Sequence, residues 1–164
     1  MKKRGILFLL FIVVSNPLSS QDLQRVEIDQ NISIEIPLDY NIVFEGDSLM
    51  VVAFTSTGKL VIERFTLPEK LMNDNEYVDG LKHYVQGYIQ GLEFGVGLEL
   101  FENRKGMLNG FQTRQIRYRI NNKEQIIETY FLVLDQQLYQ FQYSENSLIL
   151  SEDAQIIFSS IRLK

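Results

Sequence analysis

The feature that most constrains the fold is a series of four β-patterned segments in the second half of the chain, each separated from the next by a turn signal. Apolar and polar residues alternate along them, as expected for strands with one buried face. Two-residue turns such as Asn121-Asn122 join antiparallel neighbours. The series predicts a four-strand antiparallel meander over residues 98–103, 111–120, 125–134 and 137–143. Its first turn is placed either at Lys105-Gly106 or at Asn109-Gly110.

Further strands are expected earlier in the chain. Ile32, Ile34 and Ile36 alternate with polar residues until Pro37 ends the run. Residues 49–55 form a nearly continuous apolar run, which is typical of a central strand covered on both faces. The expected strands cover 32–36, 40–44, 49–55 and 60–67.

Two helices are expected among these strands. The first begins with a capping box, Asn73 followed by Glu76, and is expected to end at Gly91. Its buried stripe contains Tyr77, Leu81, Tyr84 and Tyr88. The second helix is expected to be capped by Ser151 and to bury Ala154, Ile157, Phe158 and Ile161. Helices inserted among sequential hairpins predict an α+β fold, an antiparallel β-sheet flanked by helices.

The first twenty residues have the three parts of a secretory signal peptide. Residues 2–4 are cationic, residues 5–14 are almost wholly apolar, and residues 15–20 are small, polar and interrupted by a proline. The apolar run is too short to span a bilayer, which takes about 20 apolar residues. We therefore expect residues 1–20 to be a cleaved signal peptide and residues 21–164 to form one exported domain, periplasmic or secreted.

Charge and cysteine content limit the partners of that domain. The chain contains no cysteine, which excludes disulfides, thiolate metal sites and a lipid-modified N-terminal cysteine. Removing residues 2–4 from the 16 basic residues leaves 13 against 21 acidic ones, a formal charge of −8. A domain this acidic repels nucleic acid and anionic lipid overall. We expect a soluble bacterial protein with neither a lipid anchor nor an integral membrane segment in its mature form.

Residues suited to catalysis or metal binding are sparse. His83 is the only histidine, so a Ser-His-Asp triad and a poly-histidine zinc site are not expected. The adjacent carboxylates of Glu152 and Asp153 fall in the first turn of the expected second helix, where they complement the helix dipole. We therefore expect no enzymatic activity, no cofactor and no metal.

Six basic residues cluster around the second strand of the meander, with no acidic residue among them. Alternation along that strand places Arg117 and Arg119 on one face and Arg114 on the other. One interpretation is a polar sheet face balanced by cross-strand acids such as Glu124 or Glu128. The other is a cationic surface that docks an acidic partner protein. The candidate partner-binding residues are Arg104, Lys105, Arg114, Arg117, Arg119 and Lys123.

Aromatic and amide side chains alternate along the last strand of the meander, with Tyr139, Phe141 and Tyr143 on one face. The opposite, glutamine-rich face is expected to be exposed or at an edge, where it could recognise a peptide strand or a sugar. A pocket between the first helix and the sheet would instead suit a small-molecule or lipid carrier. The candidate lining residues of that pocket are Tyr77, Tyr84, Tyr88, Phe94 and Tyr118.

Three segments resemble the PsbP-like superfamily. ISIEIPLDYNIV (32–43) is similar to its opening strand, proline, bend and second strand. YFLVLDQQLYQFQY (130–143) resembles its paired hydrophobic strands, and SEDAQIIFSSIRL (151–163) resembles its closing helix. The family includes the extrinsic PsbP subunit of photosystem II and exported bacterial proteins of unassigned role, and it shares no catalytic residues.

The resemblance implies a PsbP-like α/β/α sandwich used as a docking module. The expected function is that of a non-enzymatic, exported accessory module that acts through a protein–protein surface in the assembly of an envelope complex. A lipid or small-molecule carrier is the alternative. The sequence leaves the partner and the oligomeric state open, because fold alone does not fix function.

Overall fold

The computed structural model describes residues 22–67, 77–108, 111–121, 123–147 and 149–164, and only the backbone of residues 77–80 and Phe111. The expected signal peptide, the Asn73–Glu76 capping box and the turn at residues 109–110 lie outside the described residues. Within them the chain forms, in order, β1 (Leu23–Glu27), β2 (Ile32–Pro37), β3 (Tyr40–Glu45), β4 (Ser48–Phe54), β5 (Gly58–Thr66), α1 (Tyr77–Gly95), β6 (Leu98–Leu108), β7 (Phe111–Ile120), β8 (Ile126–Leu134), β9 (Gln137–Glu145), α2 (Glu152–Ser159) and β10 (Arg162–Leu163).

The predicted meander is present as one half of a seven-stranded antiparallel sheet with strand order β3-β4-β5-β9-β8-β7-β6. The turn between β8 and β9 is formed by Asp135 and Gln136, with φ angles of 46° and 66°. Positive φ at both central residues is typical of the tight hairpin turn that matches strand twist. β6 is longer than expected, and Lys105-Gly106 lies within it rather than at a turn.

The central strand of the sheet is β9, which pairs with β5 on one side and β8 on the other. The prediction that residues 49–55 form a central strand covered on both faces is wrong: β4 lies next to the edge strand β3. Val51 and Ala53 are fully buried on one face of β4, whereas Met50 and Val52 on the other are half-buried. α1 packs over β7 and β8, so it does not extend to β4.

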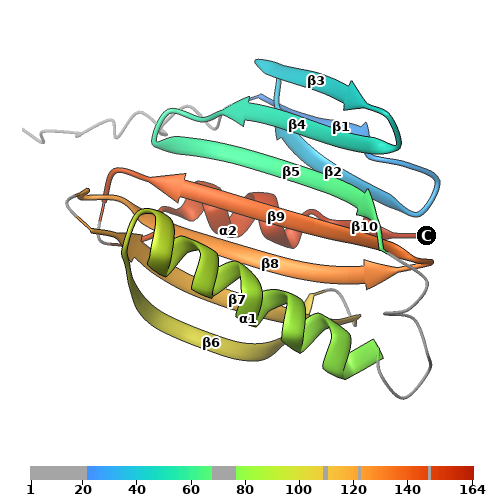
Figure 1. Cartoon of the computed structure of the whole chain (residues 1–164). Coiled ribbons are helices and arrows are strands. Elements are labelled where there is room, and N and C mark those ends of the chain that lie inside the picture. The colour runs from blue at the N-terminus through green and yellow to red at the C-terminus, as the bar shows by residue number, and fades with distance from the viewer. Residues whose placement is uncertain (1–21, 68–76, 109–110, 122, 148) are drawn as a thin grey trace, which may run out of the picture.

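A second, three-stranded sheet was not expected from the sequence. β2 lies at its centre, between β1 and β10, and both neighbours run antiparallel to it. Ile32, Ile34 and Ile36 of β2 are completely buried because they face the large sheet. This sheet brings residues 23–27 and 162–163 to either side of one strand (Figure 1).

The helices pack on opposite faces of the large sheet (Figure 1). α1 covers one face over an apolar cluster that includes Val85, Ile116 and Phe131. The other face is shared: α2 and the three-stranded sheet both pack on the cluster that contains Phe141 and Ile157. The fold is therefore α+β and mostly antiparallel sheet, and its second outer layer is a helix beside a small sheet rather than helices alone. None of the described helices has the length and apolarity needed to cross a bilayer.

α1 extends one turn beyond the expected stop at Gly91 and ends at Gly95. The amides of Val96 and Gly97 both donate to the carbonyl of Leu92, and Gly97 has a φ of 68°. This is a left-handed glycine termination, in which amides beyond the helix donate to a carbonyl of its last turn. A methyl group at Gly91 would meet no atom within 4 Å, so this glycine is an exposed helix residue.

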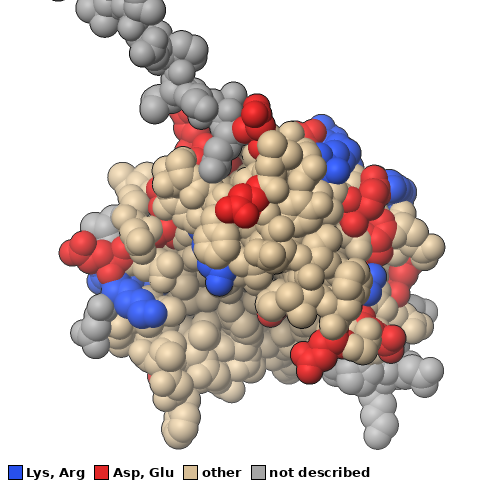
Figure 2. Space-filling model, turned by 90° about the horizontal axis from the view of Figure 1, so that it is seen from above, with Lys and Arg blue, Asp and Glu red and all other residues tan. Residues whose placement is uncertain are grey.

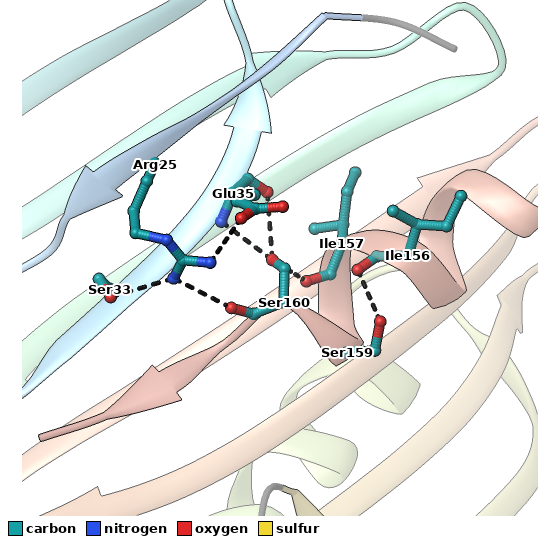
Figure 3. Close-up of polar contacts among 7 residues, drawn as sticks. All are labelled: Arg25, Ser33, Glu35, Ile156, Ile157, Ser159 and Ser160. Atoms are coloured by element: carbon teal, nitrogen blue, oxygen red, sulfur yellow. Dashed lines mark hydrogen bonds and ion pairs between the residues drawn. The ribbon is translucent and has the colours of Figure 1, made fainter.

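α2 is anchored at both ends by contacts with neighbouring strands. Ser151 occupies the N-cap position but makes no side-chain capping bond; its amide donates to Glu145 Oε2 at 2.8 Å. At the other end, Ser160 Oγ accepts from the amide of Glu35 at 2.9 Å and donates to the carbonyl of Ile157 at 2.7 Å (Figure 3). Arg25 donates to the Ser160 carbonyl at 3.3 Å, so α2 is tied to the small sheet.

The two edges of the large sheet differ in character. β3 is apolar and exposed, with Phe44 70% and Val43 48% accessible. The molecule seen from above, on the side where β3 lies in Figure 1, is largely uncharged in the lower middle of the view, while acidic and basic groups lie both near the middle and at the margins (Figure 2). At the opposite edge, β6 carries Glu99, Glu102, Arg104 and Lys105, and with β7 it forms the hairpin that bears most of the candidate residues.

Candidate binding site at the β6–β7 hairpin

The register of the β6–β7 hairpin divides the basic residues between two faces of the sheet. Lys105 lies directly opposite Arg114, on the face that carries α1. Arg104 lies opposite Gln115, and their neighbours Arg117 and Arg119 share the face that carries α2. Arg114 is therefore separated from the two later arginines, as the alternation of the sequence predicted.

Arg117 and Arg119 each face a carboxylate on a neighbouring strand. Arg117 contacts Glu128 on β8 with Nε at 2.9 Å and Nη2 at 2.6 Å, which confirms the predicted cross-strand pairing. Arg119 forms an ion pair with Glu99 on β6, and its guanidinium carbon lies 5.9 Å from the centre of the Phe101 ring. These two cations are therefore neutralised within the sheet.

The Glu128 carboxylate is the centre of a buried polar network. Only 3% of Glu128 is exposed, and besides Arg117 it accepts hydrogen bonds from Gln115 Nε2 and from the Tyr130 hydroxyl, both at 2.6 Å. Burial raises the pKa of Tyr130, and the hydrogen bond to the carboxylate and its charge raise it further. Burial disfavours the charge of Arg117, but the hydrogen bond and charge of Glu128 outweigh it and raise its pKa. A carboxylate with four donors is suited to holding structure rather than to accepting a substrate proton.

Arg104 is partly neutralised as well. Its Nε lies 3.0 Å from Glu102 Oε1 on the same strand and donates to Gln115 Oε1 at 3.0 Å. More than half of its side chain is exposed. Arg104 thus connects the Glu128 network to the surface at the end of the hairpin.

Lys105, Arg114 and Lys123 differ from the other three, because none of them has an ion-pair partner within 4.0 Å among the described residues. They do not form one patch. The six residue steps from Arg114 to the end of β7 span about 20 Å, and Lys123 lies beyond that end. The basic surface that remains on the face of α1 is the pair Lys105–Arg114, and Arg104 lies on the opposite face.

This pair lines a cavity of about 500 Å³. Its apolar wall includes Leu81 of α1 and Met107 of β6, and Tyr130 contributes a ring. Its full lining is Leu81, Arg104, Lys105, Gly106, Met107, Gln112, Thr113, Arg114, Gln115 and Tyr130, so the described lining holds three cations and no carboxylate.

Sequence reasoning missed the uncharged part of this site. Gly106 was treated as a possible turn residue, yet it lies in β6 opposite Thr113. Thr113 is 3% exposed, and its Oγ1 has no hydrogen-bond partner among the described residues. A glycine opposite a threonine in paired strands indicates that the threonine side chain lies close to the glycine backbone. This can be recognised only when the register of the two strands is known.

The pocket predicted between α1 and the sheet is occupied by side chains. The Tyr84 and Tyr88 rings pack on Phe131 with centroids 6.0 and 5.3 Å away. Phe94 is 97% exposed, and so it does not line such a space. The side chain of Tyr77 lies outside the described residues. The buried stripe expected for this helix describes these contacts better than a carrier pocket does.

The glutamine face of the last meander strand is not at an edge, which corrects that expectation. β9 is the central strand, Gln140 is 4% exposed, and Gln142 Oε1 accepts a hydrogen bond from the Tyr88 hydroxyl at 3.1 Å. These amides therefore lie under α1 and are not available to a peptide strand. His83 is an exposed residue of α1, and no group of three metal-ligating side chains occurs among the described residues.

Comparison with known proteins gives a likeness in fold. No family model matches this sequence, and no curated protein matches it. The solution structure of the cyanobacterial PsbP, CyanoP, from Synechocystis sp. PCC 6803 superimposes with a TM-score of 0.61 at 14% identity, covering 90% of this chain and 95% of that one. LpqN of Mycobacterium tuberculosis, described as involved in cell envelope biogenesis, has a TM-score of 0.52 at 14% identity over 87% of this chain and 91% of its own.

The likeness covers most of each chain. It agrees with the three segments whose patterns resembled this superfamily, which span most of the same range. The chain therefore has a PsbP-like fold.

Proposed function

We propose that this protein is an exported, non-enzymatic accessory module of the cell envelope that docks an acidic partner protein at the end of the β6–β7 hairpin. The observation that carries the proposal is the Lys105–Arg114 pair. Like charges directly opposite each other in a sheet are unfavourable, and no carboxylate compensates them among the described residues. In an otherwise acidic protein, such a pair is suited to a partner's carboxylates.

Two further observations support the proposal. The buried carboxylate of Glu128 accepts its hydrogen bonds from other side chains of the same domain. It therefore resembles a structural group more than a catalytic one. The similar structure of LpqN belongs to a protein of cell envelope biogenesis, which suggests the same setting for this chain. The signal-like residues 1–20 agree with that location.

The test is capture of a partner from envelope extract by immobilised protein comprising residues 21–164, at low and at moderate salt. Lys105→Glu and Arg114→Gln are expected to reduce capture and its salt dependence. Lys123→Glu is the matched control, because it makes the same charge change as Lys105→Glu on an exposed lysine beyond the far end of β7. Equal capture by the Lys105→Glu and Lys123→Glu proteins would contradict the proposal.

A further inference from the structure

β6 is an edge strand, and among the described residues no strand lies along its outer side. An irregularity between Leu100 and Glu102 separates its first part from a regular stretch that ends at Leu108. Such an edge presents free backbone amides and carbonyls, with which an extended segment of another protein can pair. The stretch 102–108 has the length of an ordinary strand, so it can pair with a whole added strand.

The pairing with β7 determines which backbone groups of this stretch point outward. The Asn121 amide donates to the Gly97 carbonyl at 3.1 Å, so the odd-numbered residues of β7 direct their backbone groups towards β6. Their partners in the regular stretch are Glu102, Arg104, Gly106 and Leu108. The amides and carbonyls of the residues between these, Asn103, Lys105 and Met107, therefore point away from β7 and are available to an added strand.

The cavity beside the Lys105–Arg114 pair lies at this edge. The consecutive β6 residues from Arg104 to Met107 all contribute to its wall. Because side chains alternate along a strand, Lys105 and Met107 belong to the face of α1, whereas Arg104 and Gly106 belong to the opposite face. A strand added beside β6 would follow the same alternation and contact both sets of residues.

The charges on the face of α1 select the kind of strand. Lys105 lies opposite Arg114, and neither has an ion-pair partner within 4.0 Å among the described residues. An acidic side chain at the adjoining position of an added strand would supply the missing negative charge. A second copy of β6, paired antiparallel about Lys105, would instead place two lysines opposite each other, which is unfavourable. The pair therefore favours an acidic strand over a second copy of this chain.

The opposite face of the edge is suited to apolar side chains. A hollow of about 420 Å³ lies there between the hairpin and α2, and its wall includes Leu108, Leu150 and Phe158. Arg104 also lines this hollow, so the hollow reaches the same edge. Arg104 is already paired with Glu102, and so this face does not require a second acid.

We infer that the outer edge of β6 binds an extended segment of the partner protein as an added antiparallel strand, in which acidic residues alternate with apolar ones. The acidic residues lie on the face of α1, beside Lys105 and Arg114. The apolar residues lie on the opposite face, towards α2. The inference rests on the proposed docking role and specifies the chemistry of the partner's segment.

The experiment is an NMR titration of the protein comprising residues 21–164 with a heptapeptide in which glutamate alternates with valine. Saturable shifts of the Asn103, Lys105 and Met107 amides are expected. In the antiparallel arrangement the glutamates lie beside these residues, so their amides point towards β6. Methylation of the glutamate amide nitrogens is therefore expected to weaken binding about tenfold or more, whereas methylation of the valine amide nitrogens leaves the affinity unchanged. Equal affinities of the two methylated peptides would overturn the inference.

Two proline variants test the edge on the protein itself. Met107→Pro removes an outward amide of β6 and is expected to abolish peptide binding. Ile42→Pro is the matched control on the opposite edge strand β3: the Asp39 carbonyl accepts from the Phe54 amide at 3.4 Å, so the backbone groups of Ile42 also point outward. Denaturation midpoints confirm that the variants are folded, and if Met107→Pro is not, the methylated peptides still decide. Unchanged affinity in a folded Met107→Pro protein would overturn the inference.

The acidic character of the segment is tested by charge. A peptide with glutamine in place of glutamate is expected to bind about threefold to tenfold more weakly. Lys105→Glu is expected to weaken binding of the glutamate peptide, and Lys123→Glu, away from the edge, is expected to leave it unchanged. Equal affinities for the glutamine and glutamate peptides would contradict an acidic segment.

The two proposals fail separately. Partner capture that is lost in Lys105→Glu but retained in a folded Met107→Pro protein would overturn strand addition and leave the docking role intact. Equal capture by Lys105→Glu and Lys123→Glu, with peptide binding at β6 retained, would overturn only the docking role. A parent protein that is dimeric by analytical ultracentrifugation and becomes monomeric in Met107→Pro would show that a second copy occupies the edge, which would overturn the inference.

Discussion

Arg117 holds the buried carboxylate of Glu128 from the neighbouring strand through two nitrogens, Nε at 2.9 Å and Nη2 at 2.6 Å. The pair lies on the face of the sheet that carries α2, where Gln115 and Tyr130 donate to the same carboxylate. The side chain of Glu128 is 4% exposed and that of Arg117 is 37% exposed. The carboxylate of the pair is therefore buried, whereas the guanidinium is partly accessible to solvent. The contribution of this pair to folding can be separated from that of an exposed pair on the same hairpin.

Glu128→Gln is expected to lower the free energy of unfolding by about 2–4 kcal/mol, because it leaves the Arg117 charge unpaired beside a buried amide. Glu99→Gln is the control, since it breaks the exposed pair with Arg119, and it is expected to cost less than about 1 kcal/mol. Urea denaturation of both variants measures the difference. Equal losses would show that burial of Glu128 does not matter to stability.

The two serines at the end of α2 form a second matched pair. Ser159 Oγ donates to the Ile156 carbonyl at 2.9 Å at the surface, whereas Ser160 Oγ is buried and also accepts from the Glu35 amide (Figure 3). Ser160→Ala leaves that amide without its acceptor and is expected to cost about 1–3 kcal/mol.

Ser159→Ala removes an exposed hydrogen bond only, and it is expected to stay within about 0.5 kcal/mol of the parent protein. Thermal denaturation compares the two variants, and hydrogen exchange of the Glu35 amide locates the effect. If the Glu35 amide exchanges as slowly in the Ser160→Ala protein as in the parent, its hydrogen bond to the Ser160 hydroxyl does not protect it.

Two glycines are expected to respond to alanine with opposite signs. A methyl group at Gly58 would lie 2.4 Å from the Ser144 carbonyl oxygen and 2.8 Å from the Tyr143 ring, so Gly58→Ala must displace β9 and is expected to cost about 3 kcal/mol or more. Gly91→Ala meets no atom within 4 Å and is expected to stabilise α1 by about 0.5–1 kcal/mol. Denaturant midpoints give both values. A destabilising Gly91→Ala would mean that the helix does not continue through Gly91.

The tyrosines at the contact between α1 and the large sheet lead us to expect that the protein loses stability at alkaline pH. Burial, with help from the charge of Glu63, raises the pKa of Tyr84 from 10.0 to about 12, and burial also raises the pKa of Tyr88 and Tyr118. The folded state therefore keeps protons that the unfolded chain releases near pH 10. The contribution of these groups is fully present below pH 10 and is lost as the pH rises through the folded-state pKa.

The measurement is a urea midpoint at intervals between pH 9 and pH 12, with tyrosinate absorbance recorded in parallel. Stability is expected to fall over this range, and Tyr84→Phe is expected to make the fall shallower. A midpoint that stays constant up to pH 12 would contradict the burial of these hydroxyls.

The sequence predicted the local parts of the fold well, because strand alternation and turn chemistry act over a few residues. The meander and the tight turn at Asp135-Gln136 could be predicted for this reason. β1, β10 and the β5–β9 pairing were not predicted. β10 has two residues, and β5 and β9 are separated by more than seventy residues, so no local pattern specifies either.

The candidate site shows the same limit in its electrostatics. A window of sequence without acids left open whether its six cations are free or balanced by acids on neighbouring strands, and Glu99, Glu102 and Glu128 lie just outside that window. Antiparallel pairing folds these acids back onto Arg104, Arg117 and Arg119 and leaves the Lys105–Arg114 pair. Charge counted along a strand is therefore misleading until the partner strands are known.

The position of β2 has a consequence for the order of folding. One side of this strand is covered by β1, which is close in sequence, but its other side is covered only when residues 162 and 163 arrive. A chain that enters a compartment from its N-terminus can form its hairpins in turn while β2 still presents free backbone groups along one side. Because β10 closes that side, with the Lys164 amide donating to the Asn31 carbonyl at 2.9 Å, the small sheet cannot be completed before residues 162–164 are available.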